Sequence, residues 1–164
     1  GMLQTARLKH PSTLVAIDLK PKRLDLAKRL GADLVLNPLE EDVVERVKSL
    51  TDGYGCDVYI HASGSPQGVV QGLSMIRKLG RYVEFSVFNE PTTVDWSIIG
   101  DVKELDVRGA HLSPYTYPLA IKFLADGAIK ADEILTHEFP LVEFQKAMEV
   151  AEKDEEAIKV VLRP

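Results

Sequence analysis

Cysteine, positive charge and long apolar runs are all scarce in this sequence. The 164 residues include one cysteine, Cys56, which cannot form a disulfide within the chain, so we expect a cytoplasmic protein. Twenty lysines and arginines stand against 25 aspartates and glutamates, and the formal net charge of −5 argues against a nucleic-acid partner. No apolar run approaches the length of a membrane span, so we expect no membrane partner.

Short apolar segments alternate with amphipathic ones along most of the chain. We expect strands at 14–17, 32–37, 57–62, 80–88 and 104–110, and helices at 22–30, 40–50, from the 64–68 turn to Met75 or Arg77, and at 115–126. The tail reads as an extended segment (134–139), a helix (141–151) and a strand (157–162). Alternating strands and helices predict an α/β fold, a doubly wound parallel sheet covered on both faces.

One carboxylate, Asp18, ends the first of these strands in the stretch TLVAIDLKPKRL, and the cations Lys20 and Arg23 follow it. In a dinucleotide-binding fold, an acid at this position accepts hydrogen bonds from the adenosine ribose and repels a 2′-phosphate, which selects NAD over NADP. An aspartate that simply opens a turn explains the pattern equally well. Lys20 and Arg23 leave NAD and NADP both open, because arginine also receives a 2′-phosphate.

The glycine-rich turn that accompanies such an acid is missing. A G-x-G-x-x-G segment should precede it by about 20 residues. Counting back from Asp18 passes the first residue, and residues 1–7 already read as a helix. We therefore expect a Rossmann-like domain that lacks its first strand and its phosphate-binding loop.

Four segments together resemble the carboxyl-terminal part of the medium-chain, zinc-type alcohol dehydrogenases. They are VAIDLKPKRLDLAKRLGADLVLNP (15–38), LTDGYGCDVYIHASGSP (50–66), IRKLGRYVEFSVF (76–88), and FPLVEFQKAMEV with IKVVLRP (139–164). The segment VDWSIIGDVKELDVRGAHL (94–112) further resembles the polyol branch, especially erythritol or threitol dehydrogenases.

The resemblance implies an NAD-binding Rossmann domain over residues 1–133 and a tail, 134–164, that returns to a catalytic domain. It also implies hydride transfer between NAD and a small-molecule alcohol or polyol. Zinc in the family is held by the amino-terminal domain, so we expect no metal ligand and no catalytic residue in this chain, which alone would be inactive. A zinc-free quinone or enoyl reductase and a non-catalytic interaction module are the alternatives.

The resemblance also implies a set of cofactor-binding residues. Asp18 would bind the ribose and Arg23 would lie near the adenosine. The remaining positions would line the path to the nicotinamide or offer backbone groups to its carboxamide; they are Ala62, Ser63, Gly64, Phe85, Ser86, Val87, Ala110 and Leu112. The family often has glycine where Ser86 stands. Sheet packing or turn geometry is the alternative for each residue.

The absence of a first strand would leave a gap in the sheet. Exposed strand edges recruit other strands. We therefore expect the final strand, 157–162, to fill the gap in its own chain or in a partner, as a strand-swapped homo-oligomer.

Overall fold

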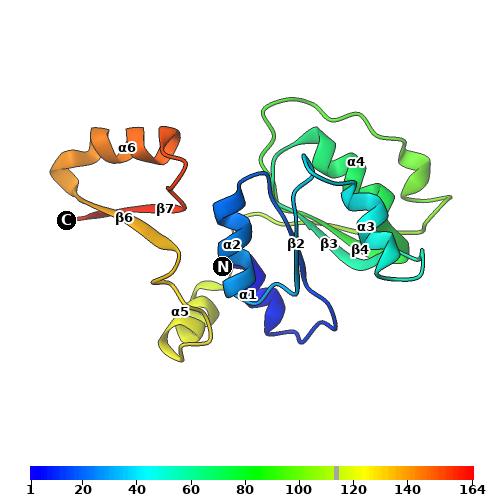
Figure 1. Ribbon diagram of the computed structural model, residues 1–164, viewed down its shortest axis with the longest axis horizontal. Coiled ribbons are helices and arrows are strands. Elements are labelled where there is room, and N and C mark those ends of the chain that lie inside the picture. Colours follow the sequence, from blue (N-terminus) through cyan, green and yellow to red (C-terminus); the bar gives the residue numbers. More distant parts are fainter. Residues whose placement is uncertain (113–114) are drawn as a thin grey trace. The chain divides into compact units, whose positions relative to one another are not determined.

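The computed structural model describes residues 1–112 and 115–164 (Figure 1). They form two compact units. Unit 1 joins Gly1–Leu39 to Thr116–Pro164, whereas unit 2 is the continuous segment Glu40–Tyr115. None of the helices in the described residues is long and apolar enough to cross a membrane.

The first half of unit 1 carries the Asp18 segment. Its elements are helix α1 (Met2–Arg7), strand β1 (Val15–Ile17), helix α2 (Pro21–Arg29) and strand β2 (Leu34–Leu36). β1 and β2 pair in parallel. Proline suits the first turn of α2 because that position needs no N–H donor. Arg7 attaches α1 to the turn before β2, since its guanidinium donates to the Gly31 carbonyl (2.9 Å) and to the Asp33 carboxylate (2.5 Å).

The second half of unit 1 is a helix followed by a β-α-β unit. The elements are α5 (Tyr117–Ala125), β6 (Leu135–Pro140), the 3-10 turn η2 (Leu141–Glu143), α6 (Phe144–Lys153) and β7 (Lys159–Arg163). The two halves of the unit are joined at Gln4, whose amide donates to the Lys130 carbonyl (3.1 Å) and accepts from the Lys130 N–H (2.8 Å). This exchange satisfies a buried polar side chain.

The prediction that the final strand fills a gap in its own chain is wrong. Within the described residues, β7 pairs with β6 in a separate parallel two-stranded sheet, with Leu135 opposite Lys159. The physical reason is proximity along the chain, because a short crossover through α6 closes this pairing at low entropic cost. A strand-swapped dimer stays a prediction.

Unit 2 contains a three-stranded parallel sheet and two helices. Its elements are α3 (Val43–Ser49), β3 (Cys56–His61), α4 (Pro66–Met75), β4 (Ile76–Glu84), the 3-10 turn η1 (Trp96–Ile98) and β5 (Asp106–Gly109). The strand order is β3-β4-β5. Asp42 caps α3, because its Oδ1 accepts the N–H groups of Val44 (2.9 Å) and Glu45 (3.1 Å). Leu73, Ile76 and Tyr82 form the core.

Strand β4 begins earlier than the sequence predicts. Its first residue, Ile76, follows α4 directly and lies opposite Cys56, and the register then shifts before Val58 meets Arg81. The ammonium of Lys103 makes this tight junction possible, because it donates to the carbonyls of Leu73 (2.5 Å), Ser74 (3.1 Å) and Ile76 (2.7 Å). β4 ends at Glu84. Residues 85–88, which the sequence predicts to be part of the strand, form the segment that follows it.

Candidate functional site

Asp18 lies just beyond β1, at the carboxyl end of the strand. Its N–H still donates to the Leu36 carbonyl (3.3 Å) of the neighbouring strand. Its Oδ1 accepts the Lys20 N–H (2.9 Å), and Arg23 Nη1 lies 3.8 Å from its Oδ2. The structure thus brings Asp18 and Arg23 together. The hydrogen bond from the Lys20 N–H shows that Asp18 does open a turn, which was one of the two interpretations of the sequence. Its Oδ2 can still accept a further hydrogen bond, beside the Arg23 guanidinium.

Two loops at the carboxyl ends of β3 and β4 lie together in unit 2. We call residues 62–65 the β3 loop and residues 85–87 the β4 loop. They hold the predicted site residues Ala62, Ser63, Gly64, Phe85, Ser86 and Val87. The Phe85 N–H donates to the His61 carbonyl (3.0 Å), which extends the strand pairing to the loops. Gly64 has φ +70°, and a Cβ there would lie 2.7 Å from the Val87 carbonyl oxygen, so only glycine permits this approach.

Ala110 and Leu112 follow β5 at the same edge of this sheet. The Ala110 N–H donates to the Glu84 carbonyl (3.0 Å), which fixes it beside the end of β4. Leu112 has φ +44° and is 78% exposed. A leucine rarely adopts this left-handed conformation, so the chain is strained at this point.

A buried histidine connects the two loops, and the sequence did not predict this role. His61 is 1% exposed. Its Nδ1 lies 3.0 Å from Glu84 Oε2, and its Nε2 lies 2.8 Å from Ser63 Oγ. A lone histidine within a strand is ordinarily a packed side chain. No local pattern marks the pair, because it is the register of β3 against β4 that places His61 opposite Glu84.

Ser63, His61 and Glu84 are connected in the order of a hydrolytic triad, but their surroundings favour another role. The imidazole is buried, so it offers no exposed nitrogen to a leaving group. Ser63 Oγ also accepts the Ser65 N–H (3.2 Å). The arrangement is therefore suited to hold the loops in place.

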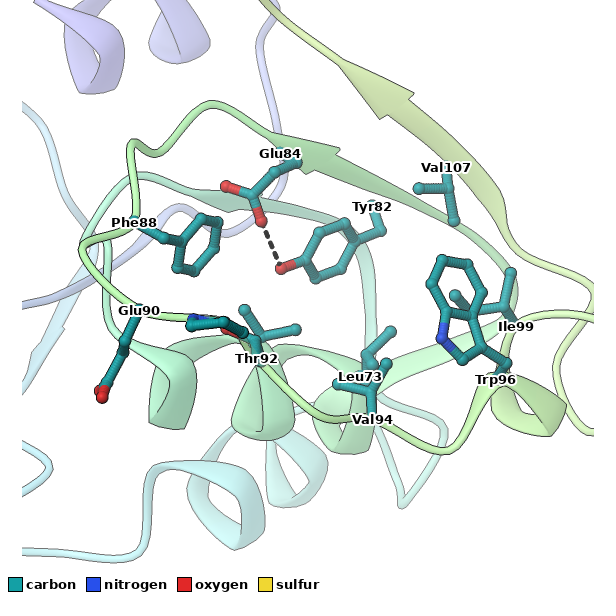
Figure 2. A pocket seen from close by; sticks show the side chains of 12 residues that line it. Leu73, Tyr82, Glu84, Phe88, Glu90, Thr92, Val94, Trp96, Ile99 and Val107 are labelled. Atoms are coloured by element: carbon teal, nitrogen blue, oxygen red, sulfur yellow. Dashed lines mark hydrogen bonds between the residues drawn. The ribbon is translucent and has the colours of Figure 1, made fainter.

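A groove of about 380 Å³ opens beside Glu84, between β4 and the segment that follows it (Figure 2). Figure 2 shows the Tyr82 hydroxyl bonded to Glu84 at 3.1 Å, with Trp96 at the other end of the groove. Thr92 Oγ1 is buried and has no hydrogen-bond partner among the described residues. Burial, followed by the charge of Glu84, raises the pKa of Tyr82 far above its ordinary range, so its hydroxyl remains a donor.

The residues that the structure describes do not form a zinc centre. Within residues 1–112 and 115–164, no three His, Cys, Asp or Glu side chains are grouped so that they could hold a metal ion. Burial raises the pKa of the Cys56 thiol to about 11, so the thiolate that zinc requires is disfavoured.

The buried thiol and phenol of β3 predict a loss of stability at alkaline pH. Burial raises the pKa of Cys56 to about 11 and that of Tyr59 to about 12. The unfolded chain then releases these protons at lower pH than the folded one, so stability is complete below about pH 8.5 and falls as pH rises toward about 12. Urea denaturation followed by circular dichroism at pH 7, 9 and 11 measures this loss.

The matched variants are Tyr59→Phe and Tyr54→Phe. Tyr59→Phe should reduce the loss of stability above about pH 10. Tyr54→Phe should leave that loss unchanged, because Tyr54 is 78% exposed. A midpoint that stays constant up to pH 11 in the unmodified chain would contradict the prediction.

Comparison with known proteins identifies the family. Residues 2–126 match the zinc-binding dehydrogenase family, so the chain belongs to that family. This confirms the resemblance seen in the sequence.

Individual relatives agree with this assignment. The chain is 52% identical over 164 residues to an erythritol/L-threitol dehydrogenase of Mycolicibacterium smegmatis, a match covering 100% of this chain and 45% of that protein. It is 38% identical over 142 residues to a D-arabitol-phosphate dehydrogenase of Enterococcus avium, covering 85% of this chain and 40% of that protein. The chain thus spans less than half the length of these relatives.

Solved structures confirm the predicted α/β class. An alcohol dehydrogenase from Thermus sp. ATN1 superposes with a TM-score of 0.84 at 31% identity, over 98% of this chain and 47% of that one. A 2R,3R-butanediol dehydrogenase from Bacillus subtilis superposes with a TM-score of 0.89, over 99% of this chain and 46% of that one. At 23% identity, this second likeness supports the fold alone.

Proposed function

We propose that this chain is the cofactor-binding part of a dehydrogenase that transfers hydride between NAD and a small alcohol or polyol. The observation that carries the proposal is Asp18, an acceptor at the carboxyl end of a parallel strand with Arg23 Nη1 at 3.8 Å. The polyols named in the relatives, erythritol, L-threitol and D-arabitol phosphate, support the substrate class. This fold accommodates NADH, since a structural neighbour from Escherichia coli CFT073 that is complexed with NADH shares it at 24% identity.

The proposal gives each predicted position a task. The Asp18 carboxylate accepts the ribose hydroxyls, and Arg23 lies beside the adenosine. The β3 and β4 loops line the path to the nicotinamide, where the closeness of Gly64 to Val87 keeps side chains out of the way. Backbone groups of Ala110 and Leu112 bind the carboxamide. When bound, NAD supplies the hydride acceptor.

The proposal extends to the organisation of the whole protein. Residues 1–133 are assigned to the Rossmann domain and 134–164 to the returning tail. We propose that the whole protein is a cytoplasmic homo-oligomer that acts on a small-molecule alcohol or polyol.

Calorimetric titration with NADH and NADPH tests the role of Asp18. We expect micromolar binding of NADH and about tenfold weaker binding of NADPH. Asp18→Ala should weaken NADH binding about tenfold, because hydrogen bonds to a charged acceptor contribute about 1.5–3 kcal/mol each, and it should narrow the preference over NADPH.

Asp25→Ala is the matched control, since it removes an exposed carboxylate from the same segment, in α2. It should leave both affinities unchanged. Equal affinity of the unmodified chain for NADH and NADPH, or no binding of either, would contradict the ribose assignment.

A further inference from the structure

We propose that His61 and Glu84 are positioning residues that lock the β3 and β4 loops into one rigid surface for the nicotinamide half of the cofactor. The inference rests on the proposed function and assigns a role to two residues that do not themselves line the path.

His61 holds the β3 loop through a hydrogen bond to Ser63. Because a carboxylate only accepts hydrogen bonds, His61 Nδ1 carries the proton that faces Glu84, at 3.0 and 3.1 Å. Nε2, on the other side of the ring, is hydrogen-bonded to Ser63 Oγ at 2.8 Å. Ser63 Oγ in turn accepts the Ser65 N–H, so the ring orients both ends of the loop through one hydroxyl.

The glutamate holds the β4 loop in the same way. Its Oε1 accepts the Ser86 N–H at 2.8 Å, and its Oε2 accepts the Tyr82 hydroxyl at 3.1 Å. Ser86 Oγ lies 3.1 Å from His61 Nδ1. One carboxylate thus fixes the backbone of the β4 loop and the tautomer of the histidine that fixes the β3 loop.

Packing leaves the ring little freedom. A Cβ at residue 68 would lie 2.7 Å from His61 Nε2 and 2.8 Å from Ser63 Oγ, so the start of α4 closes over this contact. On the other side, the Phe88 ring lies 5.4 Å from the imidazole between centroids. A buried imidazole hydrogen-bonded at both nitrogens to a half-buried carboxylate and a hydroxyl has few alternative arrangements, which is the property that a positioning residue requires.

Location restricts the expected effect to one part of the cofactor. The pair lies entirely in unit 2, whereas Asp18 and Arg23 belong to unit 1. Loss of the pair should therefore affect binding of the nicotinamide half and spare the adenosine half. A general destabilisation of the whole chain would weaken both halves alike.

The test uses His61→Gln, Glu84→Gln and the double variant. Glu84→Gln keeps the shape of the side chain and carries the test if His61→Gln does not fold. His137→Gln is the control, since His137 also faces a carboxylate, that of Asp154 at 3.5 Å, but belongs to unit 1.

Two measurements are compared in every variant. Amide hydrogen exchange of the ligand-free chain should accelerate about tenfold in residues 62–65 and 85–87 and stay constant at 18–20, as expected when a hydrogen bond to a charged group is lost. Affinity for NADH should fall about tenfold, while affinity for ADP-ribose stays the same. The double variant should be no worse than either single one, because the two residues act as a unit.

Unchanged exchange in both loops would overturn the proposal, as would an equal loss of NADH and ADP-ribose binding. If the unmodified chain binds neither nucleotide, the proposed function fails for this chain. The exchange data then decide by themselves whether the pair holds the loops.

Discussion

Replacing Gly55 with alanine is expected to lower the free energy of unfolding by about 3 kcal/mol, through overlap with backbone and a strained φ. Gly55 is the buried residue before β3 and has φ +97°. A Cβ there would lie 2.2 Å from the Met75 carbonyl oxygen and 3.1 Å from the Arg77 nitrogen. Both atoms belong to backbone at the α4–β4 junction, so they cannot turn away as a flexible side chain could.

Gly53→Ala separates the two causes of this loss. Gly53 also has a positive φ, +85°, but a Cβ there would meet nothing within 4 Å. Its substitution should cost only the conformational strain, about 1 kcal/mol. Urea denaturation of both variants measures the difference, and equal losses would show that the close approach to Met75 is relieved by movement of the chain.

Ile76→Ala should lower the free energy of unfolding by about 2–5 kcal/mol. Ile76 is 1% exposed and lies in the core of unit 2 with Leu73 and Tyr82. Its position as the first residue of β4, directly after α4, gives the surrounding backbone little room to collapse into the cavity. In urea denaturation, the loss should appear as a lower midpoint, while the slope of the unfolding free energy against urea concentration stays the same.

Ile121→Ala makes the same chemical change at a surface position. Ile121 is 64% exposed on α5, where alanine is the better helix former. Its effect should stay within about 0.5 kcal/mol. A loss at Ile121 as large as that at Ile76 would mean that apolar burial in unit 2 is not what stabilises the chain.

The order and type of the elements could be predicted from local patterns. The apolar run before Asp18, the caps and the turn glycines each act within a few residues, so the sequence shows them directly. The sequence prediction places the start of β4 four residues too late. The actual start depends on Lys103, which lies far along the chain and donates to three carbonyls at the junction. A lysine between Val102 and Glu104 carries no local sign of such a role.

In the candidate site, too, local features could be predicted from the sequence and long-range contacts could not. Asp18 could be predicted because a strand, an acid and a turn follow one another in the sequence. The His61–Glu84 pair could not, since the contact between its members depends on the register of two strands 23 residues apart. That register is fixed by a bulge that no local pattern shows. The role of β7 was missed for a related reason: two pairings were compatible with its sequence, and chain connectivity decided between them.

The division into a continuous and a discontinuous unit has a consequence for the order of folding during synthesis. Every contact within unit 2 lies inside Glu40–Tyr115, so its sheet can form while the following residues are still being made. Unit 1 must wait, because the Gln4–Lys130 hydrogen bonds join residues 126 positions apart. Until Lys130 emerges from the ribosome, the buried side chain of Gln4 has no amide partner, so residues 1–39 stay open to chaperones and proteases longer than residues 40–115 do. Limited proteolysis of stalled nascent chains would show this order as early protection of unit 2.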